Sequence, residues 1–168
     1  MQYAWTCGCC GKQYSTLPEG WAYKAPDQWV AIPVAERGSR GKCDSDRCYI
    51  EDIGFFMRGC IEIPVIGYDT TYIWGVWASV SKQSFYRILD LWDAADAENE
   101  PPHAGKLANH VAIYPPMLDL EVSLQLRSNN KRPAITLDVA DHPLAVEQRR
   151  GITVERVIEI TAALSPHH

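Results

Sequence analysis

The residues best suited to chemistry lie together near the start of the chain, at Cys7-Gly8-Cys9-Cys10-Gly11. Two residues separate Cys7 from Cys10 and a glycine follows, so one tight turn can direct both thiolates at a single metal ion. A tetrahedral zinc site needs four soft ligands, and the nearest second pair is Cys43 and Cys48, with a longer four-residue spacer. The sequence therefore predicts a structural zinc site with the ligands Cys7, Cys10, Cys43 and Cys48.

Other interpretations of the six cysteines stay open. Cys9 points away if Cys7 and Cys10 converge on a metal, and Cys60 is most simply a small core residue within a strand. In a reducing cytosol, six unliganded thiols also fit the pattern, and redox chemistry is a third interpretation. A cysteine nucleophile is disfavoured, because nothing in the sequence places a histidine beside a particular thiol.

A second group of chemically capable residues surrounds the start of a predicted helix. Asp141, His142 and Glu147 can gather there, and His110 lies in an earlier loop. With a cleft lined by Trp77, these groups could serve as general acids and bases of a hydrolase. The sequence favours the plainer interpretation, in which Asp141 caps the helix and Glu147 is a solvated carboxylate in its first turn. We find no phosphate-binding glycine loop, metalloprotease helix or nucleophile elbow in the sequence.

Composition narrows the class of protein. The chain has 168 residues, 46% of them hydrophobic and 22% charged, which is typical of one ordinary globular domain. Its formal net charge of -5 disfavours binding to nucleic acid through phosphates or to an anionic membrane surface. No apolar run approaches the roughly 20 residues of a membrane span, and no charged leader precedes an apolar stretch. We expect a cytoplasmic protein, in which the basic loop at 37–42 is solvated.

The pattern of apolar residues indicates which elements must position these groups. Strands are expected at 48–51, 55–65, 72–80, 118–127 and 135–139, and helices at 82–93, at 143–150 and from Thr153 onward. The sequence predicts a single α+β domain over residues 1–168, with an irregular segment and cysteine knuckle at 1–47 and a sheet-and-helix core at 48–165. In that core, an antiparallel sheet of about five to six strands carries helices on one side.

Three tryptophans differ in their expected roles. Trp74 and Trp92 fall on predicted apolar faces and are expected in the core. Trp77 lies on the opposite face of its strand, so it is the better candidate for a pocket wall or a partner surface. Whether His167 and His168 are native or a cloning remnant stays open.

Several segments together resemble the bacterial family of domain of unknown function 2199. The resemblance rests on Cys7-x-x-Cys10-Gly11, on residues 45–50, 55–65 and 74–81, and on Asp141 to Gln148 with Gly151-Ile152. It implies that these residues belong to family motifs: Cys48, Arg58, Cys60, Trp74, Trp77, Asp141 and His142. The family pattern often has a histidine where this chain has Tyr14, which weakens the case for zinc. The resemblance implies no activity.

Taken together, the sequence favours a non-enzymatic interaction protein with an unidentified protein partner. One concrete form is an immunity-like or antidote-like protein whose acidic surface masks a basic partner. The alternatives are the hydrolase built on Asp141, His142, Glu147 and His110, and a zinc-knuckle module that binds nucleic acid.

Overall fold

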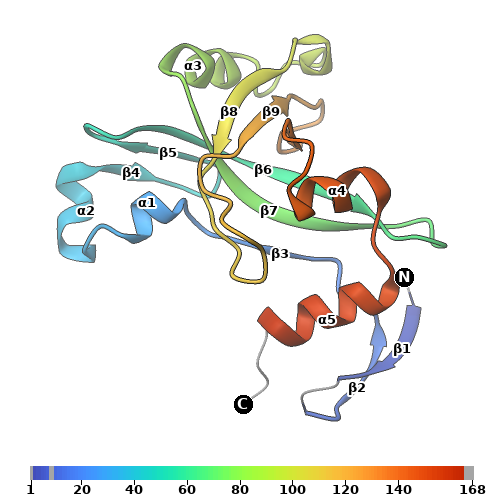
Figure 1. Cartoon of the computed structure of the whole chain (residues 1–168). Helices are drawn as coiled ribbons and strands as arrows, with labels where there is room; N and C mark the ends of the chain where they lie inside the picture. The colour runs from blue at the N-terminus through green and yellow to red at the C-terminus, as the bar shows by residue number, and fades with distance from the viewer. Residues whose placement is uncertain (1, 8–9, 165–168) are drawn as a thin grey trace.

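The computed structural model describes residues 2–7 and 10–164, in which an eight-stranded sheet, a two-stranded sheet and five α-helices are present (Figure 1). The strands are β1 (Gln2–Thr6), β2 (Gln13–Thr16), β3 (Gly20–Ala22), β4 (Gly41–Cys43), β5 (Arg47–Ile50), β6 (Gly54–Pro64), β7 (Thr71–Val80), β8 (His103–Leu107), β9 (Glu121–Gln125) and β10 (Ala134–Leu137). The helices are α1 (Asp27–Val30), α2 (Val34–Arg40), α3 (Lys82–Asp90), α4 (Pro143–Arg150) and α5 (Val154–Leu164), with a 3₁₀ turn at Ala97–Asn99.

The large sheet closes into a five-stranded barrel made of β6, β7, β8, β9 and β10. Strands β6 and β7 pair antiparallel from Phe55↔Val80 to Pro64↔Thr71, and β8, β9 and β10 follow in antiparallel order. The last strand, β10, returns to β6 and pairs with it in parallel at Ala134↔Cys60. The expected open antiparallel sheet is therefore wrong, whereas the α+β class is confirmed.

Closure depends on a close approach between β10 and β6. A Cβ atom on Gly59 would lie 2.6 Å from the Cδ1 atom of Ile135 and 2.8 Å from the carbonyl oxygen of Pro133. That carbonyl accepts a hydrogen bond of 2.9 Å from the backbone N–H of Cys60. Only glycine leaves room for the last barrel strand at this position.

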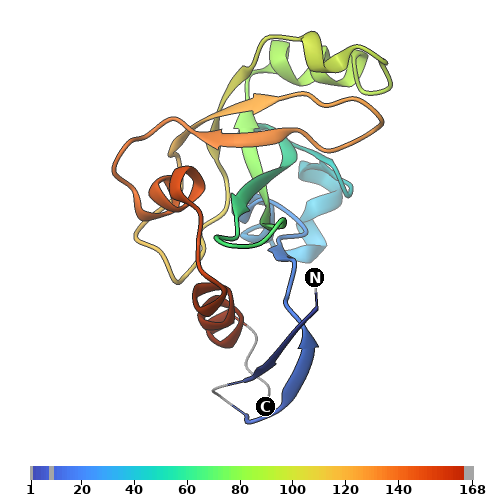
Figure 2. The same cartoon turned by 90° about the vertical axis from the view of Figure 1, so that its right-hand side faces the viewer.

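Five strands lie where none was expected: β1, β2, β3 and β4 within residues 1–47, and β8 between the helix expected at 82–93 and the strand expected at 118–127. Strand β8 follows Pro101-Pro102 in the expected loop, and β3 lies in the proline-rich first 47 residues and pairs in parallel with β7. Both are short, so neither carries enough alternating residues to show a period of two. The helices also do not share one side, because α3, α4 and α5 flank the barrel in different places (Figures 1 and 2).

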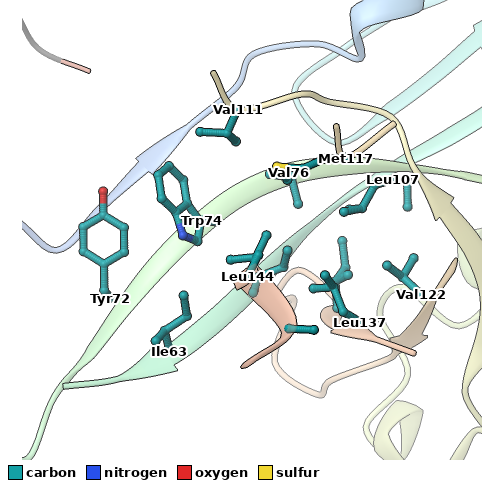
Figure 3. Packing of buried hydrophobic residues seen from close by; sticks show 14 of the residues in the cluster. Ile63, Tyr72, Trp74, Val76, Leu107, Val111, Met117, Val122, Leu137 and Leu144 are labelled. Atoms are coloured by element: carbon teal, nitrogen blue, oxygen red, sulfur yellow. The ribbon is translucent and has the colours of Figure 1, made fainter. Parts of the chain in front are cut away.

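The barrel interior forms the main hydrophobic core. Figure 3 shows inward side chains from every barrel strand and from α4 meeting in one space. The labelled members are Ile63, Tyr72, Trp74, Val76, Leu107, Val111, Met117, Val122, Leu137 and Leu144. Helix α3 adds Phe85 and Ile88, whereas α5 adds Val154, Val157 and Ile160. No helix in the described ranges is long and apolar enough to cross a membrane.

The expected helices are confirmed, and local sequence explains their ends. The hydroxyl of Ser81 accepts a hydrogen bond of 3.0 Å from the N–H of Ser84, which caps α3. The ring of His142 accepts one of 3.2 Å from the N–H of Leu144, and Pro143 begins α4. Gly151, with φ of 85°, ends α4.

A smaller second core covers the outer face of β6 and β7. Its buried members are Ile32, Cys48, Ile50, Phe56, Trp77 and Ala108. The segment before and within α1 lies over it, and one of its attachments is the amide of Asn109, which is fully buried. The side chain of Asn109 accepts from the N–H of Trp77 at 2.8 Å and donates to the carbonyl of Ala25 and the carboxylate of Asp27. Three segments distant in sequence therefore meet at this amide.

We predict that Asn109→Ala lowers the free energy of unfolding by about 2–4 kcal/mol, because buried donors and acceptors lose their partners. Chemical denaturation followed by tryptophan fluorescence measures the change. Asn99→Ala, at an exposed position, is the matched control and should change stability by less than about 0.5 kcal/mol. Equal values for the two variants would show that the amide does not hold these segments together.

Candidate ligand-binding site

A hollow of about 940 Å³ wraps around the outer edge of the β4–β5 hairpin. Side chains alternate along β5, so Cys48 and Ile50 are buried in the second core whereas Arg47 and Tyr49 are exposed. The hollow therefore has two halves. One half is lined by residues of α1 and α2, and the other by residues of the hairpin and α3; we call the second half the α3 trough. Figure 1 shows the hairpin between these two groups of helices.

Aromatic rings form the floor of the α3 trough. The ring of Phe55, on β6, lies 5.0 Å from that of Tyr49, 4.9 Å from that of Phe85 and 6.0 Å from that of Tyr86. Tyr49 is 41% exposed and Tyr86 is 51% exposed, so two large aromatic faces stay open to solvent. Such faces can stack against a flat ligand.

Positive charges form the rim of the same trough. Lys42 is the cross-strand partner of Tyr49, so it points to the same face, and Lys82 begins α3. Arg47 also lines the trough, but its guanidinium forms an ion pair of 2.9 Å with Asp44. Lys42 and Lys82 make no ion pair in the part of the chain that the structure describes. The trough thus offers two uncompensated cations on a protein whose net charge is -5.

Beyond Arg47 the trough runs into a second hollow of about 420 Å³. This hollow is lined by Asp44, Asp46 and Asp93, together with Trp92 and Leu89. Asp44 is paired with Arg47 at 2.9 Å and Asp46 with Arg132 at 2.7 Å, so ion pairs offset two of these three carboxylates.

The hairpin turn is held by its own acidic residue. One carboxylate oxygen of Asp44 accepts from the backbone N–H groups of Asp46 and Arg47, at 2.9 and 2.8 Å. Burial alone would raise the pKa of Asp44, but these two hydrogen bonds and the Arg47 guanidinium lower it overall. Behind the turn, Arg58 donates to the carbonyl of Ser45 at 3.1 Å. These hydrogen bonds therefore hold the turn of the β4–β5 hairpin, at the rim of the trough, in one conformation.

The expected zinc ligands do not come together among the described residues. Cys43 and Cys48 are direct cross-strand partners in β4 and β5, whereas Cys7 and Cys10 follow β1 in the separate two-stranded sheet. The two places are well apart in both views (Figures 1 and 2). No group of three or more histidine, cysteine or acidic side chains able to hold a metal occurs in the described ranges. Cys9 lies outside them, and zinc binding stays a prediction.

The expected acid–base residues are engaged in local structure. His142 uses one ring nitrogen to cap α4 and has the other 3.3 Å from the carbonyl oxygen of Pro115. Asp141 and His110 are exposed, and the backbone N–H of His110 donates to Asp27. Trp77 is fully buried, with its indole N–H donating to the carbonyl of Tyr23, so it does not line a cleft.

Glu147 joins three segments instead of facing solvent freely. Its carboxylate accepts from the hydroxyl of Tyr114 at 3.0 Å and forms an ion pair of 3.0 Å with Arg156. Burial, and then the charge of Glu147, raise the pKa of the Tyr114 hydroxyl well above its usual range. These contacts connect the β8–β9 loop, α4 and α5, and they support a structural role for Glu147.

We predict that alkaline pH weakens the fold through Tyr114. Above the ordinary pKa of 10.0, the unfolded tyrosine loses its proton while the folded one keeps it, so the free energy of unfolding falls as pH rises. Denaturation at a series of pH values above 10 should show a slope that is shallower in Tyr114→Phe, by up to about 1.4 kcal/mol per pH unit. Identical slopes would contradict the prediction.

Sequence reasoning did not single out the trough. The segment at 37–42 was interpreted as a solvated basic loop, although most of it is α2 and Lys42 lies on β4. One feature of the sequence does point to the trough. Tyr86 falls outside the apolar stripe of its helix, so its large ring has no core to fill and is available at the surface.

Comparison with known proteins identifies a family but no activity. A family model described as "Uncharacterized protein conserved in bacteria (DUF2199)" matches residues 6–152. No curated protein and no solved structure matches the chain.

Proposed function

The chain belongs to the DUF2199 family of uncharacterized bacterial proteins. From the geometry of its surface, we propose that it is a non-enzymatic binding protein. Its ligand is a small molecule that combines a flat apolar or aromatic part with an anionic group. The α3 trough is the binding site. The observation that carries the proposal is the combination of an open aromatic floor with two uncompensated lysines.

The size and chemistry of the site support a small ligand. Small-molecule sites are typically concave, mostly apolar and about 300–1,000 Å³ in volume, with a few polar groups that fix orientation. The hollow of about 940 Å³ around the hairpin is within this range, and the α3 trough is part of it. The rings of Tyr49 and Tyr86 can stack on a flat group, while Lys42 and Lys82 attract its anion.

The use of acid–base candidates within the fold favours binding over catalysis. Among the described candidates, His142 and Glu147 are committed to hydrogen bonds or ion pairs within the fold. None of the four acid–base candidates lines the trough. The trough also attracts anions, so a basic protein partner of the antidote kind would have to use a different, acidic surface.

The proposal predicts saturable binding of 1-anilinonaphthalene-8-sulfonate, an aromatic anion whose fluorescence rises in apolar surroundings. Lys82→Ala should weaken its affinity about two- to fivefold, the usual effect of one exposed charge. Tyr86→Ala should weaken it up to about tenfold through lost stacking. Raising the salt concentration should weaken binding to the wild type more than to Lys82→Ala.

Two exposed residues outside the trough provide matched controls. Lys131→Ala removes a cation from the β9–β10 connection, and Tyr68→Ala removes an aromatic ring, 45% exposed, from the β6–β7 turn. Both variants should keep the wild-type affinity. If they lose affinity as the trough variants do, or if the probe does not saturate, the trough is not the binding site.

A further inference from the structure

The thiols of Cys43 and Cys48 face each other across the β4–β5 hairpin. Backbone hydrogen bonds join Asp44 to Arg47 at 2.9 Å and Arg40 to Glu51 at 2.7 Å. In an antiparallel pair, hydrogen-bonded and non-hydrogen-bonded positions alternate, so Cys43 and Cys48 occupy a non-hydrogen-bonded position. The Cα atoms of such a pair are about 4.5 Å apart, within the roughly 4.4–6.8 Å that a disulfide spans.

The side chains are also oriented toward each other. Both lie on the same face of the hairpin because Cys43 and Cys48 are direct cross-strand partners, and each thiol affects the pKa of the other. The thiol of Cys43 in turn lies 3.8 Å from the carbonyl oxygen of Asp44. Both cysteines are reduced in this structure.

Exposure distinguishes the two thiols. Cys48 is 1% exposed in the second core, whereas Cys43 is partly open and lines the hollow around the hairpin. Burial raises the pKa of both thiols, and the neighbouring thiol of Cys43 raises that of Cys48 further. The pair is therefore a slow nucleophile at neutral pH, and proximity of the two sulfurs is what favours their reaction.

We propose that Cys43 and Cys48 form a reversible disulfide by exchange with a low-molecular-weight disulfide. The thiolate of Cys43 attacks one sulfur of the small disulfide and releases one small thiol, which leaves a mixed disulfide at Cys43. The thiol of Cys48 then loses its proton and attacks the sulfur of Cys43, releasing the second small thiol. Two protein thiols are oxidised by two electrons, and one small disulfide is reduced to two thiols. The inference does not depend on what the α3 trough binds.

Mass spectrometry of the wild-type protein tests the proposal directly. The protein is equilibrated with oxidised glutathione at mildly alkaline pH, alkylated under denaturing conditions and digested with trypsin. Cleavage after Lys42, Arg47 and Arg58 places Cys43 in the peptide 43–47 and Cys48 in the peptide 48–58. We expect these two peptides to be joined, and to separate again after treatment with reduced glutathione. Alkylated Cys48 beside a glutathione adduct on Cys43, or two alkylated thiols, would overturn the proposal.

Other cysteines provide controls within the same digest. Cys60 lies on β6 opposite Gly75 and Ala134, so it has no cross-strand cysteine and should form internal links at least about tenfold less often. Cys60→Ser should leave the 43–48 link unchanged. Cys48→Ser should accumulate a glutathione adduct on Cys43, and absence of that adduct would contradict Cys43 as the attacking thiol.

Discussion

The length of β6 and β7 is the constraint on which the rest of the structure depends. They pair with each other along almost their whole length, and they are longer than the other barrel strands. Each can therefore serve two other neighbours: β6 pairs with β5 near one end and with β10 further along, and β7 pairs with β3 and with β8. The β6–β7 hairpin therefore pairs both with the other strands of the closed barrel and with the strands that extend beyond it. The candidate site lies on such an extension, beside a helix that packs into the barrel.

Asn109 sets the position of the other side of the hairpin. Its hydrogen bonds hold the segment around Ala25 and Asp27 against Trp77, and the indole of Trp77 holds Tyr23 in turn. This segment covers the second core that contains Cys48. A fully buried amide such as that of Asn109 destabilises the fold unless each of its polar atoms has a hydrogen-bond partner. The same amide therefore helps to hold the segment that covers the second core, in which Cys48 of the β4–β5 hairpin is buried.

Much of the fold could be predicted from the sequence because several elements carry strong local patterns. The helix expected at 82–93 is confirmed as α3, and the strands expected at 118–127 and 135–139 are confirmed as β9 and β10. Closure could not be predicted, because it depends on one parallel contact at Cys60 and on a glycine at 59 that resembles any strand glycine. The spacing of apolar residues within one segment carries no information about a contact between residues so far apart in the chain.

The candidate site was harder to predict for a related reason. Tyr49 and Tyr86 come from separate elements, and their rings gather around Phe55 only because β5 pairs with β6 and α3 packs beside them. For the acid–base residues the difficulty was the opposite one, because closeness in sequence suggested a shared site. Asp141, His142 and Glu147 are close in sequence, but helix capping and the ion pair with Arg156 account for two of them.

Closing the barrel also limits how the large sheet can associate with other chains. In the strand order of this sheet, only β3 and β4 are outermost, and each has three residues. Three residues expose only about 10 Å of unpaired backbone, too little for a stable intermolecular ladder. Short outer strands thereby limit edge-to-edge association through the large sheet, and the exposed Lys42 adds a charge to one of them.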